Sequence, residues 1–158
     1  MAARGEQLSL VELVGAAPAS SPERSPASAC MAEIFGHAGF RPGQQEPIEA
    51  LIGGRDALVV LPTGGGKSVC YQVPAVVLAS QGKGTTVVVS PLIALMRDQV
   101  AALVAKGVRA AALDSHQAPE ERREVMARLD SGELQLLYVS PERAAVSYTH
   151  LDVYKRQG

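Results

Sequence analysis

Three glycines followed by a lysine and a serine, residues 64–68, are the part of this 158-residue chain best suited to chemistry. Such glycines let the main chain approach phosphate oxygens with its N–H groups, and a helix that begins just behind them adds a partial positive charge. Lys67 would then reach the β- and γ-phosphates of a nucleotide, and the Ser68 hydroxyl would bind Mg²⁺. The pattern predicts a phosphate-binding loop in a chain that uses a nucleotide.

The complete loop motif, G-x-x-x-x-G-K-[ST], has a glycine at the position that Leu61 occupies here. A glycine-rich hairpin or linker that ends in Lys-Ser is the alternative interpretation. The context favours the phosphate loop, because residues 57–61 have the pattern of a buried strand and the residues after Ser68 can form a helix.

Helices and strands alternate in the pattern around this loop. We expect helices at 47–52, from Lys67 with a kink or a stop at Pro74, from Leu92 to Gly107 and at 119–129, and strands at 56–61, 85–89, 110–113 and 134–139. Strands separated by helices predict an α/β fold with a parallel sheet and flanking helices. Its ligands would bind at the carboxyl ends of the strands, where the glycine loop, Ser90-Pro91 and Ser140-Pro141 would gather.

The composition is that of one ordinary domain with a formal net charge of -1, which argues against a strongly basic surface that binds nucleic acid without selectivity. The two cysteines, Cys30 and Cys70, show neither zinc-site spacing nor a disulfide framework, so a reducing compartment is the simpler inference. No apolar run approaches the roughly 18 residues that cross a bilayer. Glu12 interrupts the apolar stretch near the N-terminus, and we expect a cytoplasmic protein without a membrane segment.

The two ends differ in composition from the middle. Residues 1–28 end in a stretch rich in proline, serine and alanine, and we expect a disordered lead-in there, with the folded part at 29–145. Residues 146–158 contain no alanine but two of the four tyrosines of the chain. Their sequence looks like translated sequencing-adaptor sequence, and our hypothesis is an unnatural terminus; a real, exposed, charged tail is the alternative.

Four segments occur in an order and spacing that carry a family resemblance. They read FGHAGFRPGQ at 35–44, LPTGGGKSVCYQ at 61–72, VVVSPLIALMRDQV at 87–100 and YVSPER at 138–143. Together they closely resemble the first motor domain of the RecQ family of DNA helicases, from about residue 32 to residue 143. The resemblance implies part of a RecA-like P-loop NTPase domain, from an ATP-dependent helicase that moves 3′ to 5′ on DNA in recombination and repair.

The resemblance also implies nucleotide contacts. Gln44 would hydrogen-bond the adenine base, a role that suits an amide with both a donor and an acceptor, and Arg41 would lie beside the nucleotide. His37 stands where the family often has an aromatic ring that stacks on the base. The remaining contacts to ATP and Mg²⁺ would come from Thr63, Gly64, Gly65, Gly66, Lys67 and Ser68, with Lys67 as the catalytic residue and Ser68 as the metal ligand. For Phe35, Phe40 and Ile48 we expect core packing.

The third segment would contact single-stranded or duplex DNA. By resemblance, Ser90, Arg97 and Gln99 would lie near the DNA backbone. Ser90-Pro91 is also a competent helix start, and Arg97 would suit an ordinary solvated helix face. Both interpretations remain open for Arg97, and the DNA contact is favoured for Ser90.

Hydrolysis needs carboxylates for Mg²⁺ and for the attacking water. RecQ-like proteins supply them as Asp-Glu-Ala-His on a later strand, and this chain contains no adjacent Asp-Glu pair. We therefore expect weak nucleotide binding and no unwinding from these residues alone. The alternatives are a nucleotide-binding module without turnover and another P-loop enzyme, such as a small-molecule kinase, which would leave Gln44 and Ser90 unexplained. The oligomeric state stays open.

Overall fold

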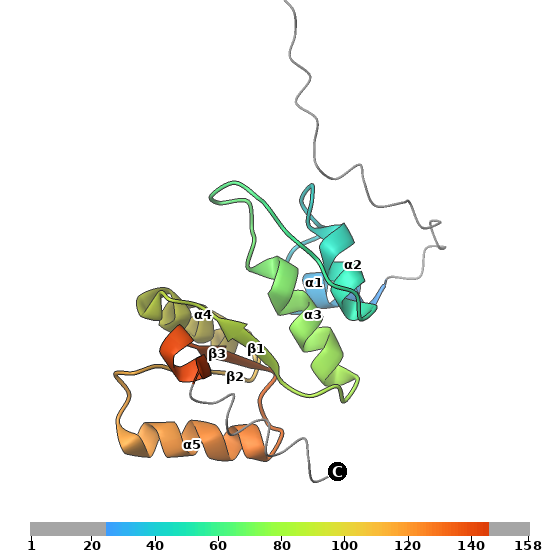
Figure 1. Ribbon diagram of the computed structural model, residues 1–158. Coiled ribbons are helices and arrows are strands. Elements are labelled where there is room, and N and C mark those ends of the chain that lie inside the picture. The colour runs from blue at the N-terminus through green and yellow to red at the C-terminus, as the bar shows by residue number, and fades with distance from the viewer. Residues whose placement is uncertain (1–24, 146–158) are drawn as a thin grey trace, which may run out of the picture.

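Helices and strands alternate through residues 25–145, the part of the chain that the computed structural model describes (Figure 1). In chain order the elements are α1 (Pro26–Glu33), α2 (Gln45–Ile52), α3 (Val69–Ser80), β1 (Thr86–Val89), α4 (Ile93–Ala105), β2 (Ala110–Leu113), α5 (Pro119–Asp130) and β3 (Leu136–Val139). The expected tail at 146–158 and most of the expected lead-in, 1–24, lie outside the described residues.

The strands form a three-stranded parallel sheet in the order β1-β3-β2. Leu136 of β3 is in register with Thr86 on one side and with Ala110 on the other. Parallel neighbours need crossover connections, which α4 and α5 supply here. The predicted α/β fold with a parallel sheet and flanking helices is confirmed.

The sheet separates two apolar clusters, because side chains alternate between the faces of a strand. On one face Leu136 and Tyr138 of β3 pack with residues of α1–α4. On the other face Leu137 and Val139 pack with Val125 of α5. Figure 1 accordingly shows the sheet between α4 and α5, with α1, α2 and α3 gathered beside it. The expected core positions Phe35 and Ile48 are buried, and Phe40 is partly buried against the same cluster.

Helix α3 positions the glycine loop, which directly precedes it. The helix packs mainly against α1, α2 and β3. It runs through Pro74 as one element, so of the expected kink or stop at this proline the stop is wrong. A proline inside a helix removes one main-chain hydrogen bond. The neighbours Val73, Val76 and Val77 are buried, and their packing offsets that loss.

The strand expected at 56–61 is the main correction, because these residues form no strand in the structure. Leu58 is 89% exposed and Val60 is 84% exposed. A strand exists only when a neighbour takes up its main-chain hydrogen bonds, and within residues 25–145 no strand pairs with this segment. The strand prediction at 56–61 is therefore wrong, because an apolar sequence alone does not supply the partner that a strand needs.

Smaller differences concern element ends and faces. Helix α1 begins at Pro26, three residues before the expected start of the fold, because Ser25 accepts a hydrogen bond from the Ser28 N–H and a proline fits the first turn. On α4 the expected apolar stripe is only partly covered: Met96 and Leu103 are buried, but Leu92, Leu95 and Val104 are exposed. None of the helices described for residues 25–145 is long and apolar enough to cross a bilayer.

Candidate nucleotide-binding site

The loop before α3 presents main-chain donors that its own fold does not use. Gly65 donates its N–H to the Pro62 carbonyl at 2.9 Å, which closes a turn, and Gly64 and Gly66 have φ angles of 78° and 75°. The N–H groups of Gly66, Lys67 and Ser68 make no hydrogen bond within residues 25–145. Unused N–H groups at the start of a helix attract an anion. The loop therefore fits a phosphate group.

Lys67 is exposed and lies within the loop that it would serve. Its ammonium Nζ donates to the Leu61 carbonyl at 2.7 Å. An ammonium has three donors, so this bond leaves capacity for phosphate oxygens. Ser68 precedes α3 directly, and its hydroxyl makes no capping hydrogen bond. Thr63 is exposed beside them, without a side-chain hydrogen bond among the described residues.

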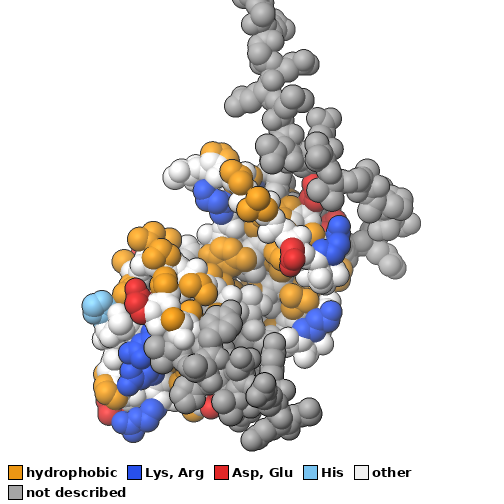
Figure 2. All heavy atoms as spheres, in the orientation of Figure 1, with side chains coloured by type: hydrophobic (Ala, Val, Ile, Leu, Met, Phe, Trp, Pro, Cys, Tyr) orange, Lys and Arg blue, Asp and Glu red, His pale blue; other side chains and the backbone are white. Residues whose placement is uncertain are grey.

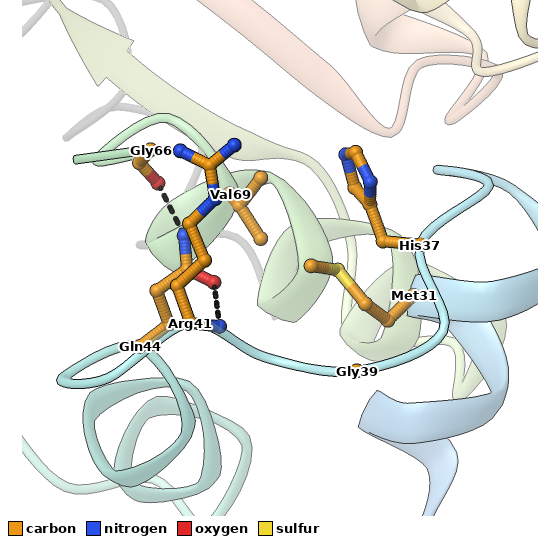
Figure 3. Close-up of a pocket in the computed structure, with 7 residues that line it drawn as sticks. All are labelled: Met31, His37, Gly39, Arg41, Gln44, Gly66 and Val69. Carbon is orange, nitrogen blue, oxygen red and sulfur yellow. Dashed lines mark hydrogen bonds between the residues drawn. The ribbon is translucent and has the colours of Figure 1, made fainter. Parts of the chain in front are cut away.

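Gln44 lies against the glycine loop, and both ends of its amide are occupied (Figure 3). Its side-chain oxygen accepts the Arg41 N–H at 2.8 Å, and its Nε2 donates to the Gly66 carbonyl at 3.1 Å and to the Gly65 carbonyl at 3.4 Å. The residue is 1% exposed. In this conformation Gln44 holds the loop, and its amide has to leave these partners before it can bind a base.

The glycine at 66 is required by this close approach. A Cβ added there would overlap Gln44 Nε2, and its φ lies in the region that L side chains rarely adopt. Arg41 adds a second link, because its Nη1 donates to the Gly64 carbonyl at 3.0 Å. The segment expected to contact the base, with Arg41 and Gln44, is thus hydrogen-bonded to the glycine loop expected to bind the phosphates.

A small hollow of about 120 Å³ opens between these motifs. Its lining residues are Met31, His37, Gly39, Arg41, Gln44, Gly66 and Val69. Figure 3 shows Arg41 and Gln44 on one side of the hollow and His37 with Met31 on the other. The side chain expected to stack on a base and the one expected to hydrogen-bond it therefore face a common space.

Burial raises the pKa of two thiols and one phenol in the core, which favours their neutral forms. Burial raises the pKa of the Cys70 thiol, on the first turn of α3, and burial raises the pKa of Tyr138 in the sheet. Burial, assisted by Glu33, raises the pKa of Cys30 to about 11. These groups add no negative charge that would oppose a phosphate.

Each of the residues expected at DNA has its own intramolecular partner. The Ser90 hydroxyl accepts the Leu92 N–H at 3.4 Å, so it does not cap α4, which begins at Ile93. Gln99 accepts a hydrogen bond from Gln72 at 2.7 Å.

Arg97 pairs with Asp114, whose side chain is 0% exposed, whereas that of Arg97 is 55% exposed. The Arg97 Nε and Nη2 both donate to the Asp114 carboxylate, at 3.1–3.3 Å. The sequence reasoning missed Asp114 and Gln72. Asp114 could have been found, because it follows β2 at the carboxyl end of the sheet, where ligands of parallel sheets bind.

A metal site built from the protein alone is not evident. Within residues 25–145 no group of three His, Cys, Asp or Glu side chains could hold a metal ion. The Ser68 hydroxyl is the group next to the loop that suits Mg²⁺, and one hydroxyl is too few, since Mg²⁺ prefers six oxygen ligands. Most ligands of such an ion would have to be phosphate oxygens, water and side chains from elsewhere.

Comparison with known proteins assigns the family. Residues 41–156 match the model of the DEAD/DEAH box helicases. The ATP-dependent DNA helicase RecQ of Haemophilus influenzae is 49% identical over 77% of this chain and 19% of its own length, and the RecQ of Bacillus subtilis is 44% identical over 74% and 19%. The ATP-dependent helicase SGS1 of Saccharomyces cerevisiae is 47% identical over 73% of this chain and 8% of its own length. The chain thus spans about a fifth or less of these relatives, and it belongs to the DEAD/DEAH box helicases, as a RecQ-type member.

Proposed function

We propose that the chain is part of an ATP-dependent DNA helicase of the RecQ type, which moves 3′ to 5′ and acts in recombination and repair in the cytoplasm. Residues 29–145 would supply part of its ATP-binding domain. The observation that carries the proposal is the set of unused N–H groups at Gly66, Lys67 and Ser68, with Gln44 and Arg41 bound to the same loop. The printed names of the relatives, ATP-dependent DNA helicases, agree with it.

Each loop residue has a distinct role in this proposal. The N–H groups bind the β- and γ-phosphates, and the Lys67 ammonium exchanges the Leu61 carbonyl for phosphate oxygens. That positive charge stabilises the charge that develops on the transferred phosphoryl group. Ser68 would hold Mg²⁺, and the ion would supply positive charge that neutralises part of the phosphate charge. Gln44 binds the adenine, with Arg41 and His37 beside it and Thr63 at the start of the loop.

Titration with a fluorescent ATP analogue and Mg²⁺ tests the nucleotide site on the 158-residue chain. Lys67→Ala should weaken binding by about tenfold or more, because it removes a charge-assisted hydrogen bond to phosphate. Lys83→Ala is the matched control: this exposed lysine lies beyond the other end of α3 and should leave the affinity unchanged. Equal affinity of the Lys67→Ala variant and the parent chain would contradict the loop assignment.

The DNA interface is proposed on α4 and the turn that precedes it, from Ser90, Arg97 and Gln99. Contacts to phosphates depend little on sequence and weaken steeply with salt. Single-stranded oligonucleotides of different sequence should therefore bind with similar affinity, which falls as salt rises from about 50 to 200 mM. A strong preference for one sequence, or no salt dependence, would count against this interface.

A nucleotide-binding module without turnover is the second candidate for these residues taken alone. It is favoured by the lack of a carboxylate cluster within residues 25–145. Phosphate release from ATP separates the two, since the module predicts binding without release. Transfer to a sugar or nucleoside would instead support a small-molecule kinase.

A further inference from the structure

A buried hydrogen-bond network joins three elements behind the candidate site. Gln72 of α3 donates through Nε2 to Gln99 Oε1 of α4 at 2.7 Å and to the Tyr138 hydroxyl of β3 at 3.0 Å. The Tyr138 hydroxyl in turn donates to the Tyr71 hydroxyl at 3.5 Å. Gln72 is 5% exposed and Tyr138 is 1% exposed. A buried amide nitrogen with both protons donated is fixed in place, because any rotation leaves a buried donor without a partner.

The network also fixes which end of Gln99 faces away from the core. Its Oε1 accepts from Gln72, and its own Nε2 has no hydrogen-bond partner within the described part of the chain. Gln99 is half-buried, unlike Gln72. An amide held by its oxygen presents two N–H donors on the opposite side. Gln99 is therefore a pre-oriented donor on α4.

Gln72 also links the helix behind the glycine loop to α4. Gln72 lies in the first turn of α3, which begins at Val69 directly behind the phosphate loop. Helix α3 otherwise packs mainly on α1, α2 and β3. The bond to Gln99 thus connects the start of the loop's helix to α4, the helix that follows Ser90.

We propose that Gln72 is a positioning residue that holds the Gln99 amide so that its N–H groups bind a phosphate of single-stranded DNA. A shift of the first turn of α3 when nucleotide enters the loop would then reach the DNA contact through this one bond. The proposal rests on the DNA interface of the proposed function. It adds a residue that touches neither ATP nor DNA itself.

Binding of a fluorescein-labelled oligothymidylate by four variants tests the proposal at low salt. Gln72→Met keeps the length and apolar packing of the side chain but removes the donor, and Gln99→Met removes the contact itself. Each should weaken DNA binding by about threefold to tenfold, the effect of one hydrogen bond. The double variant should bind no more weakly than the weaker single variant, because both changes remove the same contact.

Tyr138→Phe is the matched control. It removes the other acceptor of Gln72 from the same buried network and leaves the Gln72–Gln99 bond in place. It should lower the Tm but leave DNA affinity within about twofold, since a single buried hydrogen bond matters to stability. A purely structural network predicts the opposite: DNA affinity would follow Tm in all variants. That correlation would overturn the proposal, as would losses that multiply in the double variant.

Side-chain amide NMR spectra provide a readout without ligand. The Gln99 NH₂ signals, assigned by their disappearance in Gln99→Met, should move toward those of free glutamine in Gln72→Met and stay in place in Tyr138→Phe. Unchanged signals in Gln72→Met would show that Gln72 does not position Gln99. If the parent chain and Ser90→Ala both fail to bind DNA while the NMR shift occurs, the proposed DNA interface is wrong and the positioning of Gln99 stands.

Discussion

The Gln44 side chain uses both ends of its amide within the protein. Its amide oxygen accepts from Arg41 and its amide nitrogen donates to the loop carbonyls of Gly65 and Gly66. An amide has only these two ends to offer. If Gln44 reads adenine as proposed, base binding has to exchange at least one of these bonds. Recognition of the base and the conformation of the phosphate loop are then linked through one residue.

The two positive-φ glycines of the loop predict different costs on substitution. Gly64→Ala meets no atom within 4 Å and should cost about 1 kcal/mol in backbone strain. Gly66→Ala adds an overlap with Gln44 Nε2, which has to give up its bonds to the loop. The free energy of unfolding should therefore fall by about 2–4 kcal/mol, as urea denaturation would measure. Equal losses for the two variants would show that Gln44 does not hold the loop.

The thiol of Cys30 predicts a pH dependence of stability. Burial raises its pKa in the folded state to about 11, from an ordinary value of 9.0. As pH rises above that ordinary value, the unfolded chain releases the proton and the folded chain keeps it. Stability from this group is therefore present below about pH 9 and is lost progressively toward pH 11. Urea denaturation from pH 8 to 10.5 should show a smaller decline in Cys30→Ala than in the parent chain.

At the scale of elements, local pattern predicted most of the structure. The β-branched run at β1, the apolar spacing of α4 and the proline at the start of α5 are signals carried by a few adjacent residues, and all three elements lie within two residues of the expected ends. Pro74 misled, because packing of the valines around it keeps α3 continuous. The strand prediction at 56–61 was wrong, because a strand forms only with a hydrogen-bonding partner and no local pattern reveals that partner.

The candidate site was predictable in the same measure. Residues 64–68 and Gln44 carry motif signals, and the structure brings Gln44 to Gly66. Gln72 lies in the motif segment 61–72 and Asp114 follows β2, but no local signal shows that they bond to Gln99 and Arg97. A hydrogen bond between α3 and α4, or between α4 and the end of β2, depends on how the elements pack. Motifs predict which residues act, whereas packing decides which residues orient them.

The Arg97–Asp114 pair links α4 to the end of β2, so removing it should lower the free energy of unfolding. Asp114 also accepts the His116 N–H at 2.8 Å, so Asp114→Ala leaves this part-buried donor without its partner. Arg97 is half exposed and can be hydrated, which limits the cost to about 1–3 kcal/mol. Arg123→Ala is the control. Its pair with Glu120 is exposed, so this variant should change the free energy of unfolding by less than about 0.5 kcal/mol. Similar unfolding free energies for both variants would contradict this link.

One strand edge lacks a partner in the described part of the molecule. Within residues 25–145 strand β1 pairs only with β3, so its outer edge is open. Val87 and Val89 are 47% and 53% exposed on β1. Figure 2 shows apolar side chains at several places on the face that it draws. An open, uncharged edge of this kind is a template for pairing with another chain.

The open edge predicts self-association of the 158-residue chain. Val89→Lys should shift sedimentation toward monomer and reduce binding of an apolar dye, because a lysine on an edge strand opposes pairing. Val104→Lys on α4 is the matched control, since Val104 is also 53% exposed but lies on a helix, away from any strand edge. It changes net charge by the same amount. If both variants raise the monomer fraction equally, net charge rather than the β1 edge governs association. A parent chain that is monomeric at high micromolar concentration would show that the β1 edge does not drive self-association.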